Sequence, residues 1–179
     1  PTLTRETVLL LLDAYPGDIG ALAPLYLNLR LLQPGEAVFL GPGIPHAYLH
    51  GAGLELMANS DNVLRGGLTP KHMDIEELAR ILDFSPYYPA SLPCSQESAE
   101  LRTYESPAEE FSLSAITLEG GSLALDTRQM PVILLCLEGA ATLRAEAVEL
   151  ELTRGGSAFV SADTGPYSLS GSARLWAAT

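Results

Sequence analysis

The sequence is poor in residues that mark several common classes of protein. Its 179 residues include two cysteines, one tryptophan and three histidines, and Lys71 is the only lysine. Cys94 and Cys136 lie far apart without the spacing of metal ligands, which favours two reduced thiols in a cytoplasmic protein over a disulfide. No apolar run approaches the roughly 18 to 20 residues that cross a bilayer, so we expect no membrane association.

Positive charge is scarce as well. The formal net charge is −12, which argues against nucleic-acid partners and anionic membranes, because phosphate-rich surfaces select basic proteins. Solubility alone is the simplest explanation of this balance. A small phosphorylated ligand would need locally gathered cations, which draws attention to Arg65 and Lys71. The chain also begins at Pro1 without an initiator methionine, which indicates trimming, processing or a fragment.

Two short helices are predicted. The first, from Thr4 to Tyr15, has Thr4 as its cap and ends at Pro16-Gly17, and we interpret it as the end of a larger helical region. The second, from Asp74 to Leu82, begins with Asp74 followed three positions later by a glutamate, which is the pattern of a capping box.

Strand-like patterns fill most of the remaining chain. From Leu25 to Met57, Pro-Gly and Gly-Pro turns interrupt short segments that we predict to be strands. Alternation returns in FSLSAITLEGGSLAL, PVILLCLEGAATLRA, VELELTRGGSAFV and YSLSGSARLWAA, which favours an antiparallel sandwich or barrel. The predicted division of the chain is a helical end at 1–15, part of a barrel at 16–84, a proline- and serine-rich connector at 85–103 and a second barrel at 104–179.

An internal repeat relates the two predicted barrels. Residues 32–49 (LQPGEAVFLGPGIPHAYL) align without gaps with residues 152–169 (LTRGGSAFVSADTGPYSL), and each copy has a turn glycine before a strand-like segment. The pattern resembles the second motif of cupin jelly rolls. The fold class is therefore predicted to be mainly β: the closing part of one cupin-like jelly-roll barrel, a second complete one, and short helices. Pro166 occupies the position of His46, and no histidine follows His72, so the second barrel is expected to be metal-free.

One block, PHAYLHGAGLELMANSDNVLRGGLTPK, carries most of the side chains suited to chemistry. Imidazoles, carboxylates, a guanidinium and an ammonium in one glycine-punctuated segment are typical of a site for an anionic, oxygen-rich small molecule. Taken singly, each has a structural alternative, such as a packed histidine, a surface ion pair between Arg65 and Asp61, or a solvated lysine. The candidate residues are His46, His50, Glu55, Asp61, Arg65 and Lys71.

This block also resembles a known family. PHAYL followed by E-x-MA-x-SDNVLR-x-GLTPK is similar to a motif near the end of the catalytic domain of type I phosphomannose isomerases, the zinc-dependent mannose-6-phosphate isomerases. YPGDIGALAPLYLN, LLQPGEAVFL and MDIEELARILDF resemble the same family, so the similarity extends from about Tyr15 to Phe84. Because family members are much longer, the resemblance implies that the chain corresponds to their C-terminal half.

The resemblance implies an activity and roles for individual residues. The complete enzyme would interconvert mannose 6-phosphate and fructose 6-phosphate through an enediolate at one zinc ion. His46 would be a zinc ligand, with a Gln, a His and a Glu supplied from upstream. Arg65 would act at the reacting centre and Lys71 would hold the substrate. Further substrate contacts are expected from Tyr48, Glu55 and Asp61.

Several alternatives stay open at this stage. His50 follows His46 on the same face of a predicted strand, but the family has no ligand at its position. The chain is either part of an isomerase, a non-catalytic cupin-type sugar-binding or interaction module, or a short isomerase that completes its site with a partner chain. The expected partners are a small-molecule sugar phosphate and the missing N-terminal half, with no nucleic acid and no membrane.

Overall fold

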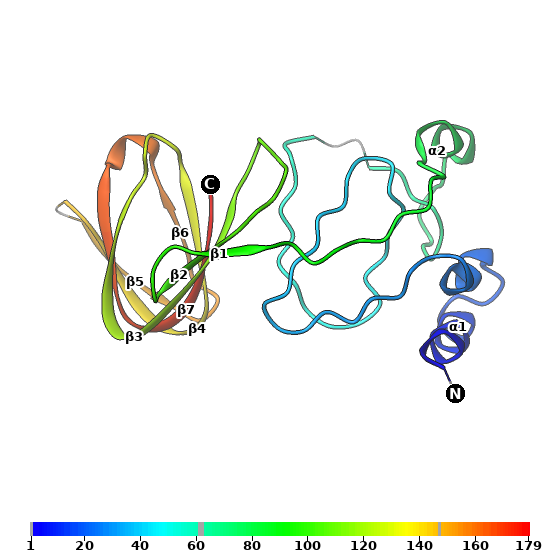
Figure 1. Cartoon of the computed structure of the whole chain (residues 1–179), viewed down its shortest axis with the longest axis horizontal. Coiled ribbons are helices and arrows are strands. Elements are labelled where there is room, and N and C mark those ends of the chain that lie inside the picture. The colour runs from blue at the N-terminus through cyan, green and yellow to red at the C-terminus, as the bar shows by residue number, and fades with distance from the viewer. Residues whose placement is uncertain (1, 61–62, 147) are drawn as a thin grey trace. The chain divides into compact units, whose positions relative to one another are not determined.

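The chain folds as two units (Figure 1). The structure is a computed structural model that describes residues 2–60, 63–146 and 148–179. The first unit comprises Pro1–Gly53 and Asn59–Ser91, and the second comprises Leu54–Ala58 and Leu92–Thr179. None of the helices formed by the described residues combines the length and the apolar character that a bilayer crossing requires.

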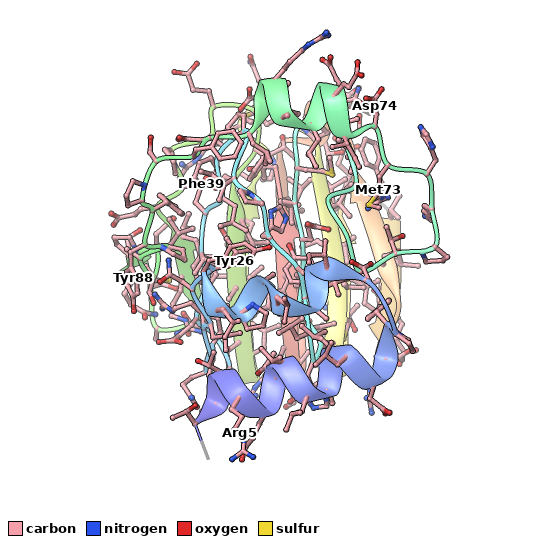
Figure 2. All side chains as sticks on the ribbon, turned by 90° about the vertical axis from the view of Figure 1, so that its right-hand side faces the viewer. Arg5, Tyr26, Phe39, Met73, Asp74 and Tyr88 are labelled. Atoms are coloured by element: carbon pink, nitrogen blue, oxygen red, sulfur yellow. The ribbon has the colours of Figure 1, made fainter. Side chains whose placement is uncertain are left out.

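The first unit begins with two helices that lie side by side. Helix α1 (Leu3–Ala14) is capped by Thr2, whose hydroxyl accepts from the backbone N–H of Arg5 at 3.4 Å. The predicted helix is confirmed, but the predicted cap at Thr4 is wrong, because the first turn starts earlier and places Thr4 inside the helix. The 3₁₀-helix η1 (Ile19–Leu25) follows, with Asp18 as its cap (Figure 2).

The third helix lies at the opposite end of this unit, as both views show (Figure 1 and Figure 2). Helix α2 (Ile75–Ile81) is capped by Asp74, whose carboxylate accepts from the N–H of Glu77 at 3.0 Å. The predicted start at Asp74 is therefore confirmed. The glutamate of the predicted capping box has another contact, since its carboxylate accepts from Arg80 at 3.1 Å.

The strands predicted between Leu25 and Met57 are wrong for the described residues. This segment is extended but irregular, and its one β-type pairing is an isolated bridge from Val38 to Ser91. An extended segment becomes a strand only when a neighbour pairs with its backbone, and the described residues provide such a neighbour only at this bridge. Alternating sequence is therefore not sufficient for a strand here.

Polar side chains hold the extended segments of the first unit in place. The guanidinium of Arg30 donates to the carbonyl of Pro89 and to the hydroxyl of Ser91, the latter at 3.1 Å, and lies 5.2 Å from the centre of the Tyr88 ring. These contacts join segments about 60 residues apart in sequence. The order of this unit thus depends on hydrogen bonds from side chains to distant backbone groups.

The second unit is one antiparallel sheet. Its hydrogen-bonded order is β1-β2-β3-β7-β4-β5, and β6 pairs with β4 beside β7. The strands correspond closely to the alternating runs predicted from the sequence, and the mainly β fold class is confirmed. Their bounds, with the short 3₁₀-helix η2, are β1 (Cys94–Gln96), β2 (Leu101–Tyr104), β3 (Leu113–Asp126), β4 (Val132–Ala145), β5 (Val148–Thr153), β6 (Ser157–Val160), η2 (Ala162–Thr164) and β7 (Pro166–Ala178).

Two expectations about this unit need correction. The predicted complete barrel is not closed by hydrogen bonds among the described residues, because the strand order runs from β1 to β5 without returning to its start. In addition, β1 and most of β2 lie inside the predicted connector 85–103, so the later part of that segment belongs to the sheet. Pro86, Pro89 and Pro93 precede β1 and account for the connector-like composition.

The core of the second unit lies between the curved strands (Figure 1). Alternate residues of β3, β4 and β7 point inward, which explains their period-two pattern. Both cysteines are free, as the sequence indicates: Cys94 is exposed, and Cys136 is buried, with its pKa raised by that burial. The largest fully buried side chains are Ile116, Leu134, Cys136, Leu169 and Leu175.

A row of glycines crosses the middle of the three long strands. Gly120 in β3, Gly139 in β4 and Gly171 in β7 have φ angles of +81°, +73° and +134°. The register shifts near the first two, between Glu119 and Gly121 and between Cys136 and Glu138. A Cβ at Gly139 would lie 2.0 Å from the Ser172 carbonyl oxygen, so only glycine fits. Two of these glycines therefore lie at or beside irregularities in the strand pairing.

The two copies of the internal repeat form similar turns. In the first copy the N–H of Glu36 donates to the carbonyl of Gln33 at 2.9 Å, and in the second Gly156 donates to Thr153 at 2.8 Å. Gly35 and its counterpart Gly155 have φ angles of +87° and +82°. The turns are alike, but among the described residues only the second copy continues into regular strands, β6 and β7.

Candidate functional site

His46 is exposed and lies in an irregular segment of the first unit. Its Nδ1 lies 3.0 Å from the carbonyl oxygen of Ile44. Because a carbonyl only accepts, Nδ1 must carry the proton of this hydrogen bond. In the neutral ring the lone pair is then on Nε2, the form that binds a metal ion. The hydrogen bond to its own backbone therefore leaves the lone pair of Nε2 available.

The loop before His46 is held by the end of α2. The carbonyl of Gly43 accepts from the N–H of Asp83 at 2.9 Å. Gly43 has a φ of +77°, and a Cβ there would lie 2.6 Å from the carbonyl oxygen of Ile81. Only glycine allows this approach. The position of His46 thus depends on a contact between its loop and a helix far along the chain.

Tyr48 lies next to His46. Their ring centres are 5.8 Å apart with an angle of 63° between the planes, which is an edge-to-face contact. The predicted strand that would carry both side chains is not formed, yet the extended backbone still places the two rings together. His50, which was considered as a second ligand, is also exposed in this segment.

Arg65 and Lys71 are exposed and lie on one short segment around Leu68. The hydroxyl of Thr69 accepts from the N–H of Lys71 at 3.2 Å, which forms a tight turn just before the lysine. The N–H of Leu68 donates to the carboxylate of Asp18 at 2.8 Å. This segment is therefore tied to the start of η1.

Neither of the two predicted carboxylates belongs to the described part of the first unit. Glu55 is exposed and belongs to the second unit, whereas His46, Arg65 and Lys71 belong to the first. Asp61 lies outside the described residues.

The described residues contain no cluster of three or more histidine, cysteine, aspartate or glutamate side chains that could hold a metal ion. A catalytic zinc site has three protein ligands plus an open position. His46 fits one such ligand in its exposure and its hydrogen bonding. His46 is therefore a candidate for one ligand of such a site.

Two contacts that shape the site were not predicted from the sequence. An aspartate before a helix predicts a cap, and Asp18 is one, but its second contact reaches Leu68, 50 residues away. The contact between Asp83 and Gly43 joins backbone to backbone. The only sequence signal for it is the GPG triplet, which indicates a turn but not the turn's neighbour.

Comparison with known proteins agrees with the resemblance in the sequence. Residues 100–179 match the family described as "Mannose-6-phosphate isomerase, cupin domain". Over 174 residues, 95% of the chain, the sequence is 43% identical to mannose-6-phosphate isomerase of Salmonella typhimurium, and over 169 residues, 88% of the chain, it is 40% identical to the human enzyme of that name. Nearly the whole chain is thus similar to part of the mannose-6-phosphate isomerases.

Solved structures of this family share the fold. Mannose 6-phosphate isomerase from Salmonella typhimurium, bound to its substrate and to zinc, matches 99% of the chain with a TM-score of 0.89 and 40% identity. The match covers 46% of that structure, and the chain spans 44% and 39% of the Salmonella and human relatives. The chain thus spans less than half the length of the relatives it matches.

Proposed function

We propose that the chain is the C-terminal part of a mannose-6-phosphate isomerase, which interconverts mannose 6-phosphate and fructose 6-phosphate. The observation that carries the proposal is the extent of the likeness: 40% identity and a TM-score of 0.89 over 99% of the chain, to a structure bound to substrate and zinc. The named relatives are all isomerases, which favours this function over the alternative of a non-catalytic sugar-binding or interaction module.

His46 is the zinc ligand that this chain supplies. Its Nδ1 donates to Ile44, so Nε2 has the lone pair that a metal ion needs. The other ligands come from the missing N-terminal half, because the described residues offer no complete set. Zinc bound there would act as a Lewis acid toward the oxygens of the sugar.

The reaction moves a hydrogen between neighbouring carbons. A base removes a proton from the hydroxyl-bearing carbon beside the carbonyl, which leaves an enediolate with negative charge on its oxygens. The hydroxyl proton then passes to the former carbonyl oxygen, and the first proton is returned to the former carbonyl carbon. Arg65 stabilises that charge, because a guanidinium is always ionised and presents several donors. Lys71 holds the phosphate as a compact cation. The exposure of both side chains is consistent with these roles.

Three further residues take supporting roles. Tyr48 contacts the ring of His46 and so lines the sugar pocket beside the metal ligand. Glu55 and Asp61 remain candidates for contacts with the substrate, because carboxylates beside an isomerisation centre can orient a substrate or relay protons.

The proposal also accounts for the irregular first unit. We assign its extended segments, within 16–84, to the closing strands of the catalytic barrel, which pair with strands of the N-terminal half. The extended backbone, in which the described residues form only one isolated bridge, supports this assignment. We also assign residues 104–179 to a second, metal-free jelly roll. This proposal is more specific than the open antiparallel sheet formed by the strands of this region. A cytoplasmic location stays a prediction.

The test compares the full-length protein with the 179-residue chain. Zinc content after dialysis against a mild chelator and turnover of mannose 6-phosphate are measured for both. We expect about one zinc per chain and turnover only for the full-length protein. Tight zinc or turnover in the short chain by itself would overturn the fragment assignment. If turnover of the short chain rises more steeply than its concentration, a site completed by a partner chain is supported instead.

Variants of the full-length protein then test each role. His46→Ala is expected to remove zinc and activity together, whereas His72→Ala, a matched change of another exposed histidine, retains both. Arg65→Lys should lower kcat about 100-fold with zinc retained. Lys71→Met should mainly raise KM. Full zinc and activity in His46→Ala would refute the assignment of the ligand.

A further inference from the structure

Asp18 joins two segments of the first unit through its carboxylate. Oδ1 accepts from the N–H of Gly20 at 2.7 Å, and Oδ2 accepts from the N–H of Leu68 at 2.8 Å. The first hydrogen bond caps η1 locally, and the second spans 50 residues. Both are short and charge-assisted, so they are stronger than ordinary hydrogen bonds between neutral groups.

The backbone around this contact is close-packed. Gly67 has a φ of +138°, and a Cβ there would lie 3.5 Å from the Cα of Gly20 and 3.6 Å from Oδ1 of Asp18. A Cβ at Gly20 would in turn lie 3.0 Å from Oδ1 and 3.4 Å from atoms of Leu68. Glycine at position 20 thus leaves room for the carboxylate, and glycine at position 67 allows the backbone conformation that brings the Leu68 N–H to it.

Leu68 itself has an unusual backbone conformation. Its φ is +52°, a region that a leucine rarely adopts without support from its surroundings. The hydrogen bond from its N–H to Asp18 supplies such support. Arg65 and Lys71 lie on either side of Leu68, so the direction in which the chain carries both cations depends on this one residue.

We propose that Asp18 is a positioning residue of the isomerase: its carboxylate fixes the backbone of Leu68 and thereby the placement of Arg65 and Lys71 toward the sugar phosphate. The inference rests on the proposed function. Asp18 does not touch the substrate, and it acts only through the segment that it holds. Because a displacement of about 1 Å can lower a rate about 100-fold, a single bridging carboxylate suffices for a large effect.

A simpler role, that Asp18 only caps η1, is separable by substitution. Asparagine is as good a cap as aspartate, so Asp18→Asn retains a cap for η1. It replaces one acceptor oxygen with an NH₂ group, which cannot accept from the second N–H. Asp74→Asn is the matched control: Asp74 caps α2 by accepting from Glu77, and the same substitution there disturbs no contact with Leu68.

The experiment measures kcat, KM for mannose 6-phosphate, zinc content and thermal unfolding in the full-length protein. For Asp18→Asn we expect kcat/KM to fall about 10- to 100-fold, from both a lower kcat and a higher KM, with zinc content unchanged. Asp74→Asn should match the wild type. Zinc is the decisive readout, because its proposed ligand His46 lies on a different segment, whereas a general loss of folding would release the metal.

A double variant tests whether Asp18 acts through the cations. In a Lys71→Met background, the rise in KM caused by Asp18→Asn should be smaller than in the wild type, because the group to be positioned is already gone. Wild-type kinetics in Asp18→Asn, or a loss of activity that parallels loss of zinc or of folding, would overturn the inference. If the wild-type full-length protein itself has no turnover, the proposed function fails first, and faster hydrogen exchange of the Leu68 amide in Asp18→Asn still shows whether the contact exists.

Discussion

The two units keep their backbones in place by different means. In the second unit, inward-facing apolar side chains of β3, β4 and β7 form a core, and nearly every segment has a hydrogen-bonded neighbour. In the first unit, long irregular segments are fixed at single points by polar groups such as Arg30, Asp18 and the Asp83 N–H. The residues proposed for chemistry are mostly in the first unit. Binding residues commonly lie on loops that a scaffold holds in place.

Substitutions should lower stability more in the packed second unit than at the polar anchors of the first unit. The residues of a core pack against one another, so a substitution that disturbs one of them lowers the stability of the whole unit. A polar anchor at the surface contributes one or two hydrogen bonds, and its loss frees only the segments that it joins. The expected effects therefore decrease from a crowded backbone in the sheet to a polar anchor in the first unit.

The largest effect is expected from Gly139→Ala. Its new Cβ would meet the Ser172 carbonyl oxygen at 2.0 Å, and alanine disfavours the φ of +73° at this position. We expect a loss of about 3 kcal/mol or more in the free energy of unfolding, measured by urea denaturation. Gly155→Ala is the control, with φ of +82° but no described atom within 4 Å of the new Cβ, so it should cost only about 1 kcal/mol. Equal losses would show that the strands do not meet so closely.

An intermediate effect is expected from Thr127→Val. The buried hydroxyl of Thr127 donates to the Ala162 carbonyl at 2.8 Å and accepts from the Gly165 N–H at 3.2 Å. Valine has the same shape but leaves both backbone groups without this partner, so unfolding should become easier by about 2 kcal/mol. Urea denaturation again gives the value. A loss below about 0.5 kcal/mol would mean that a water molecule replaces the hydroxyl.

The smallest effect is expected from Arg30→Met, which removes the same kind of anchor from a half-buried position in the first unit. Methionine keeps much of the apolar side chain but cannot donate to Pro89 or Ser91. We expect a loss of about 1 kcal/mol, confined to the first unit. Hydrogen exchange followed by mass spectrometry should show faster exchange near residues 87–91 and unchanged exchange in β4. Equal acceleration in β4 would show that the two units unfold together.

How much could be predicted from the sequence also differs between the units. The long runs of alternating residues located β3, β4 and β7 well, because each strand pairs with neighbours that are also in this chain. The cap at Asp74 and the turns at Gly35 and Gly155 involve only residues close in sequence, so local patterns were enough to predict them.

The features that were not predicted depend on contacts between residues far apart in sequence, which no local pattern reveals. Residues 25–57 alternate like strands, but the described residues offer them almost no partner, and the prediction failed there. The candidate site was only partly predictable: the motif named His46, Arg65 and Lys71, but nothing in it indicates that Asp18 holds the segment between the two cations. The close backbone approach at Gly139 was also missed, since a glycine inside a strand pattern does not reveal which backbone approaches it.

The contrast between the two cysteines gives the molecule a single natural attachment point. Cys94 is exposed in β1, whereas the thiol of Cys136 is buried beneath the sheet, where a maleimide cannot reach it without unfolding. A fluorophore can therefore be placed at one defined position of the chain without any substitution. From there it would report on the local environment at the edge of the sheet, just after the point where the chain enters the second unit.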